Sequence, residues 1–202
     1  MPERAVSDVD ALHAVLDAGL VAHVSVCDDE GQPFVLPVAY ARWDDEVIFH
    51  GSTASRLFRG LAAGQPTCLT VTRLDGLVLA RSAFESSMNY RSVMVLGSAR
   101  QLDGDDKYEA LRRVSDHLLP HRWDDIRPPS PKELAATLVL ALSLTECSVK
   151  IREGGPEDPD EDMAIPTWAG HVPLIERFGE PVAADATAAA FPLPAYVRAW
   201  TR

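Results

Sequence analysis

The residues from 50 to 59 combine the end of an apolar strand, a glycine turn, and a run of hydroxyl and guanidinium groups at the start of a helical pattern. Backbone N–H groups at a helix start are unpaired and favour an anion. An arginine beside them adds charge-assisted hydrogen bonds to phosphate. The segment therefore predicts a phosphate cradle, although an ordinary helix cap with surface arginines has the same residue types. The donors are Ser52, Thr53, Ser55 and Arg56.

Two further segments have residue types suited to a ligand site. Residues 81–92 hold three arginine or asparagine side chains, four serines and a tyrosine, and they fit either a ligand-binding segment or a polar loop between strands. Trp168 lies among glycine and proline residues, where its ring fits either a rigid wall for a planar ligand or a plug that seals a chain segment to the core.

Composition narrows the class of partner. The 202 residues carry a formal net charge of -11, and 47% of them are hydrophobic. An acidic surface repels nucleic acids and anionic membranes, so neither is expected as a partner, but a local anion pocket remains compatible with it. The three cysteines are far apart without CxxC spacing, and no metal site is expected. The first residues lack a signal-peptide pattern, and the apolar runs are too short to span a bilayer, so the expected location is the cytoplasm.

Hydrophobic periodicity predicts a mainly β protein with helical additions. Ser7 is the expected cap of a first helix that Gly19 ends, and a tight turn is expected at residues 74–76. Strands are expected over residues 20–26, 33–40, 46–50, 67–72, 77–80, 90–102 and 137–151, and further helices after residue 53 and over residues 103–119.

The composition changes after Arg152, which divides the chain into two parts. Residues 1–152 are expected to form the barrel domain. Residues 153–162 form an acidic run that is expected to stay solvated. The rest of the 153–202 segment is expected to be an arm that packs on the barrel or on a dimer partner.

In order and spacing, several segments resemble the pyridoxamine 5′-phosphate oxidase-like family of FMN-binding split β-barrels, a Greek-key type of fold. The similar branch includes the nitroimidazole-resistance proteins. The resemblance covers about residues 15–151 plus the segment around Trp168. It rests on residues 34–40, 48–52, 55–56, 76–82, 87–93, 97 and 168–174.

The resemblance implies a homodimer with two flavin sites at the subunit interface, each holding FMN or alternatively FAD. His50 matches a histidine near the flavin in the nitroimidazole branch, and it is the implied catalytic residue. Leu57 stands where the pyridoxamine oxidases have a lysine, so oxidation of pyridoxamine phosphate is not expected. The implied cofactor-binding residues are Pro37, Val38, Ala39, Tyr40, His50, Gly51, Ser52, Ser55, Arg56, Asn89, Arg91, Ser92 and Trp168.

Two classes of function follow from this resemblance. The first is a flavin-dependent oxidoreductase for a small aromatic or nitro-aromatic substrate, with His50 as a proton donor. The second is a flavin carrier or sensor without turnover. A member of the same fold that binds haem or the deazaflavin F420 is a further alternative.

Overall fold

The structure is a computed structural model that describes residues 5–6, 8–28 and 30–200. The elements in chain order are β1 (Ala5–Val6), α1 (Val9–Ala18), β2 (Val21–Cys27), β3 (Pro33–Trp43), β4 (Glu46–Ser52), α2 (Arg56–Ala62), β5 (Pro66–Leu79), β6 (Ser87–Ser98), β7 (Arg100–Gln101), α3 (Gly104–Leu118), η2 (Trp123–Asp125), α4 (Pro131–Ala135), β8 (Thr137–Ser143), β9 (Cys147–Arg152), η3 (Asp160–Asp162), β10 (Gly170–Pro173), α5 (Ala186–Ala189) and α6 (Ala195–Arg198).

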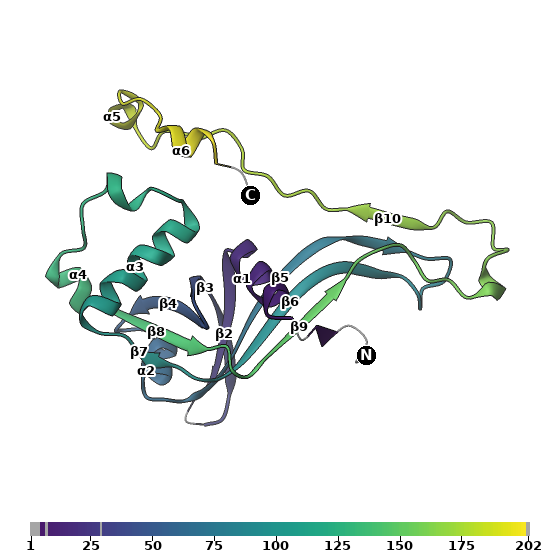
Figure 1. The fold of residues 1–202 in the computed structure, drawn as a ribbon, viewed down its shortest axis with the longest axis horizontal. Coiled ribbons are helices and arrows are strands. Elements are labelled where there is room, and N and C mark those ends of the chain that lie inside the picture. The colour runs from purple at the N-terminus through teal and green to yellow at the C-terminus, as the bar shows by residue number, and fades with distance from the viewer. Residues whose placement is uncertain (1–4, 7, 29, 201–202) are drawn as a thin grey trace.

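The strands form one curled antiparallel sheet in the order β1-β9-β6-β5-β2-β3-β4-β8-β7, and β10 pairs with β5 (Figure 1). The expectation of a mainly β split barrel with helical additions is confirmed. In Figure 1 the β5–β6 hairpin extends well beyond the barrel on one side, whereas α2 lies on the opposite side of the molecule. This separation decides which candidate residues one chain can bring together.

Two apolar clusters hold the barrel. Alternate side chains of β2, such as Ala22 and Val24, are fully buried and pack with α1 residues such as Leu16 inside the curl of the sheet. This alternation is the pattern of a strand with one face in the core. The second cluster lies between α3 and the outer face of β3, β4 and β8, and it includes Ile48 and Val114.

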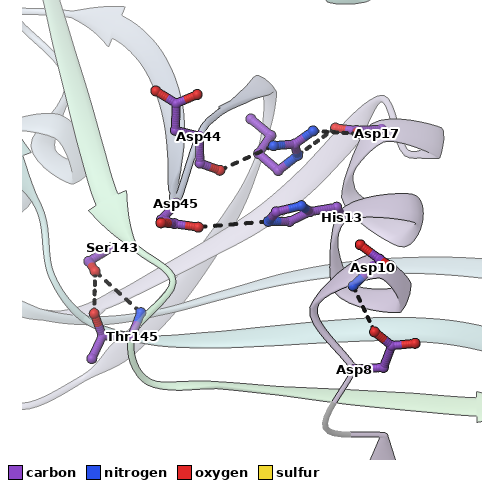
Figure 2. A network of polar contacts seen from close by, with 9 residues as sticks. Asp8, Asp10, His13, Asp17, Asp44, Asp45, Ser143 and Thr145 are labelled. Carbon is purple, nitrogen blue, oxygen red and sulfur yellow. Dashed lines mark hydrogen bonds and ion pairs between the residues drawn. The ribbon is translucent and has the colours of Figure 1, made fainter.

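Helix α1 is fixed to the β3–β4 turn by polar contacts (Figure 2). The Arg42 guanidinium donates two hydrogen bonds, of 2.8 and 2.7 Å, to the Asp17 carboxylate. His13 Nε2 lies 3.9 Å from Asp45. At the start of the helix, the Asp8 carboxylate accepts from the backbone N–H two residues on, at 2.9 Å. Ser7, the cap predicted from the sequence, lies outside the described residues; Gly19 ends the helix as predicted.

Three strand predictions were wrong. Residues 90–102, expected as one strand, form the greater part of β6 and the short strand β7, which pairs with β8 and not with the partners of β6. Residues 66–79 form one strand with a bulge between Leu74 and Gly76, not two strands joined by a turn. Long-range contacts override the local turn preference, because Asp75 accepts from an arginine of β6 and Gly76 packs against the backbone of β10. Conversely, residues 137–151 form two strands that diverge at residues 144–146: β8 pairs with β4, and β9 pairs with β6.

The C-terminal arm begins after β9, and its strand β10 pairs with β5 of the barrel sheet. Beyond β10 it runs back across the molecule towards α5 and α6 (Figure 1).

The expectation that the acidic run stays solvated is wrong for Asp158, whose side chain is only 2% exposed. Its carboxylate accepts from the backbone N–H and the guanidinium of Arg81, each at 2.7 Å. No helix in the described part of the chain is long and apolar enough to cross a membrane.

Candidate functional site at the split of the barrel

Strands β3 and β4 pair with each other over only part of their length. The pairing begins at Tyr40 opposite Phe49 and ends at the turn. Residues 33–39 of β3 are paired only with β2, and residues 50–52 of β4 only with β8. Within the described chain, the facing edges of these two segments have no strand partner, so their backbone N–H and C=O groups are available to a ligand. Pro37, Val38 and Ala39 lie on this open edge, as the predicted site requires.

Tyr40 is placed differently from its neighbours. Its side chain is fully buried, and its hydroxyl donates a 2.6 Å hydrogen bond to the Leu16 carbonyl oxygen. Its backbone lies where β3 and β4 are paired. In the structure Tyr40 therefore closes the split and fills the core, and its phenol does not face the open edges.

His50 and Gly51 form the open edge of β4. The His50 ring is half-buried, and its Nδ1 atom is buried without a hydrogen-bond partner among the described residues. Burial lowers the pKa of His50 below its usual value of 6.5, because the charged form loses hydration. The ring is therefore neutral at pH 7. At Gly51, a Cβ atom would lie 2.2 Å from the Phe58 ring, so only glycine lets α2 pack this closely.

The segment from Ser52 to Arg56 carries the predicted phosphate ligands. Ser52 accepts from the backbone N–H of Ala54 at 3.1 Å, and Thr53 bonds to a carbonyl oxygen before β8. Ser55 occupies the cap position of α2, yet its hydroxyl makes no capping hydrogen bond. Arg56 is the first residue of the helix and is 64% exposed. The Ser55 hydroxyl and the exposed Arg56 guanidinium thus lie next to the split, where an anion could reach both.

The position of the Arg56 guanidinium depends on two residues that the sequence analysis missed. Its carbon atom lies 4.2 Å from the centre of the Phe34 ring, and one of its nitrogens lies 3.5 Å from the Asp28 carboxylate. Asp28 also accepts from two backbone N–H groups of the β2–β3 turn. Sequence spacing does not show that Asp28 lies near Arg56, because their approach depends on how β2 and β3 pack against α2.

The other predicted cofactor residues lie in a different part of the chain. Asn89 is buried, and its amide donates to the Gly154 carbonyl oxygen at 3.0 Å and accepts from Arg152. Arg91 makes two hydrogen bonds to Asp75, of 2.9 and 2.6 Å. The Asn89 amide and the Arg91 guanidinium are therefore engaged within the chain.

Ser92 and Trp168 complete this second group. Ser92 is half-buried in β6, opposite Thr72 of β5. Trp168 is 66% exposed and stands just before β10, which pairs with the end of β5 that lies opposite Asn89 of β6. The predicted cofactor residues thus fall into two groups within one chain, called here the predicted half-sites: residues 37–39, 50–52 and 55–56 at the split, and residues 89, 91, 92 and 168 on the extended hairpin side.

The described residues contain no group of three or more histidine, cysteine, aspartate or glutamate side chains that could hold a metal ion.

The family model described as pyridoxamine 5′-phosphate oxidase matches residues 8–151. The chain belongs to this family. No curated protein sequence matches it significantly. Among solved structures, an FAD- and haem-binding protein from Mycobacterium smegmatis is 42% identical with a TM-score of 0.93, and the match covers 98% of this chain and 97% of that one.

Two other solved structures are similar to this chain. The flavocytochrome Anf3 from Azotobacter vinelandii is 42% identical with a TM-score of 0.91, covering 97% of this chain and 91% of that one. A candidate 5-nitroimidazole antibiotic resistance protein from Bacteroides thetaiotaomicron is 19% identical with a TM-score of 0.60, covering 73% and 86%. The latter likeness shows the fold alone.

Proposed function

We propose that this protein binds a flavin nucleotide at the split between β3 and β4. The observation that carries the proposal is the pair of unpartnered strand edges, which end beside the Ser55 hydroxyl and the exposed Arg56 guanidinium. A flavin ring has a polar edge that backbone groups can recognise, and its nucleotide phosphate suits a guanidinium. Membership of the family supports the same assignment.

Of the two flavin nucleotides, FAD is now favoured over FMN. The sequence pieces match an FMN-binding pattern, but a relative at 42% identity over nearly the whole chain is described as binding FAD. The adenosine half of FAD lies outside the motifs that the sequence displays, so only the relative argues for it.

We also propose that two copies of the chain form a homodimer that joins the half-sites. The outward positions of β2, β3, β5 and β6 carry no Asp, Glu, Lys or Arg in a chain of net charge -11, and Val21, Val35 and Met94 among them are 49%, 55% and 39% exposed. An uncharged, partly apolar sheet face of this kind is typical of a surface that a partner covers. These positions are Val21, His23, Ser25, Val35, Pro37, Ala39, Cys68, Thr70, Thr72, Ser92, Met94 and Leu96.

A bound flavin supplies electron transfer, so the proposed activity is oxidation or reduction of a small molecule that stacks on the ring. Because His50 is neutral at pH 7, its contribution would be a hydrogen bond from one ring N–H and not a proton from an imidazolium ion. A variant His50→Ala should keep the flavin but slow turnover. Equal turnover would reduce His50 to a structural residue, whereas a protein that holds the flavin but shows no turnover would be a flavin carrier or sensor, the second class of function.

Haem is a second candidate cofactor, favoured by a specific observation. Both solved relatives at 42% identity are described by their flavin together with a haem or cytochrome group, and both align over at least 97% of this chain. The proposed function is therefore that of a flavin protein that also holds haem and exchanges electrons between the two groups.

The first test is the absorption spectrum of the purified protein, followed by heat release and mass analysis of the ligand. The two-band spectrum of oxidised flavin and the mass of FAD support the proposal, and the mass of FMN corrects the choice of nucleotide. A Soret band supports the haem assignment. Protein that stays colourless after incubation with FMN, FAD and haem contradicts both.

A further inference from the structure

A cavity of about 660 Å³ lies between the end of α1, the start of β2, the edge of β5 and the C-terminal arm. Its size falls within the range of about 300–1,000 Å³ that is usual for sites of small molecules and cofactors. Its lining includes none of the residues at the split between β3 and β4. The flavin proposed for that split leaves this cavity unused.

The lining of the cavity combines three kinds of side chain. His23 supplies an imidazole, Arg73 and Arg177 supply positive charge, and the apolar part includes Leu20 and Phe178. A nitrogen ligand, two cations and apolar walls match the chemistry of a flat apolar ring with a central metal and carboxylate groups at its edge. Haem has this chemistry, and histidine is its most familiar protein ligand.

His23 has the geometry of an available ligand. Its neighbours in β2, Ala22 and Val24, are fully buried in the core, so strand alternation directs His23 to the opposite face of the sheet, where it is exposed in the single chain. It lies between Pro37 and Thr70 of the adjacent strands. No hydrogen bond or ion pair joins its ring to another described residue, so neither ring nitrogen would have to give up a partner within this part of the chain.

The two arginines place positive charge at the same cavity. The Arg73 guanidinium donates a 2.7 Å hydrogen bond to the Ala18 carbonyl oxygen, which fixes one of its nitrogens. Another of its nitrogens lies 3.9 Å from Glu176, a contact too long for a strong pair. Arg73 therefore retains donors for a carboxylate group, and Arg177 adds a second positive charge to the lining of the cavity in a strongly acidic protein.

The C-terminal arm forms part of the cavity wall, and the two relatives described by a haem or cytochrome group align with the chain over most of this arm. Residues 175–178 of the arm form one wall, and the Phe178 ring packs against Trp200 with centroids 5.7 Å apart. The family model ends at residue 151, before the arm begins. The two relatives described by a haem or cytochrome group align over at least 97% of the chain, and therefore over most of the arm as well.

We propose that this cavity is the haem site, with His23 as a ligand of the iron. Arg73 and Arg177 would pair with the propionate groups, and Phe178 would pack against the porphyrin. The assignment rests on the haem part of the proposed function and adds the residues that perform it.

The test uses the full chain, reconstituted with haem and with its flavin, and compares His23→Ala with His171→Ala. His171 is an exposed histidine of β10 that does not line the cavity, so it controls for the general loss of a surface imidazole. The readouts are the Soret spectrum, the haem content and the flavin content. The expected result is loss of the histidine-ligated spectrum in His23→Ala alone, with flavin content unchanged in both variants. Added imidazole should restore the spectrum of His23→Gly.

A second variant tests the arm, since loss of an apolar ring contact in Phe178→Ala should weaken haem affinity by about tenfold. If His23→Ala keeps the spectrum and the haem affinity of the unaltered protein, the ligand is another residue and the inference is wrong. If the unaltered protein takes up flavin but no haem, the haem part of the proposed function fails as well. Flavin content separates either result from a folding defect.

Discussion

Removal of the Arg56 guanidinium should weaken flavin nucleotide binding measurably. In the structure this group is 64% exposed, stacked on Phe34, and 3.5 Å from one oxygen of Asp28. To bond a phosphate it has to move away from that carboxylate, while its stacking on the ring can persist. The relevant free energy is therefore the new phosphate contact minus the lost contact with Asp28.

The size of the effect follows from these two terms. A hydrogen bond to a charged group contributes about 1.5–3 kcal/mol. The contact with Asp28 is exposed, and pairs of this kind contribute about 0–1 kcal/mol. The net loss in Arg56→Ala is then about 0.5–3 kcal/mol, which raises the dissociation constant by about 2- to 160-fold. Because the site is exposed, the effect should shrink as salt is added.

The assay is flavin titration followed by fluorescence quenching, with Arg59→Ala as the matched control. Arg59 is an exposed arginine one turn further along α2 and is not a predicted ligand. Asp28→Asn offers the opposite perturbation, since its amide oxygen can still accept the two turn hydrogen bonds while its charge no longer holds Arg56. Binding should tighten in that variant. Equal affinities for Arg56→Ala and Arg59→Ala would refute the assignment of the phosphate to Arg56.

Three further predictions concern stability and the arm. Gly51→Ala should lower the free energy of unfolding by about 1–3 kcal/mol, because its Cβ meets the buried Phe58 ring, whereas Gly155→Ala adds a methyl group in open space and should be near neutral in a urea titration. Gly76→Ala should detach β10, since the added Cβ would lie 2.6 Å from a backbone oxygen of that strand. Limited proteolysis should then cleave the arm faster than in the unaltered protein. An unchanged cleavage rate would contradict the close packing of Gly76 against β10. His50 has a lowered pKa in the folded state, so the unfolded chain binds the proton more readily and stability falls as pH drops below about 6.5. His50→Gln should therefore lose less stability than the unaltered protein between pH 7 and 5, and parallel curves would show that burial of this ring does not matter.

Much of the barrel could be predicted from the sequence because its signals are local. Apolar alternation located β2, β3 and β4, and the glycine at position 19 correctly ended α1. The errors occurred where distant segments decide the outcome. Residues 74–76 have a turn composition, yet contacts with Arg91 and β10 hold them inside a continuous strand. Asp158 has the composition of a solvated loop, yet Arg81 binds and buries it.

The candidate site divides in the same way. Residue types and their spacing alone determined that a strand, a glycine turn, hydroxyls and Arg56 lie close together, since these groups are consecutive in the chain. Only the tertiary structure decided that β3 and β4 separate beyond Tyr40 and leave two open edges, and that Asn89 and Arg91 form their hydrogen bonds in a different part of the chain, away from that split. It also decided that His23 faces a cavity closed by the arm. The physical reason is that strand pairing and burial join residues far apart in the sequence, which local spacing does not specify.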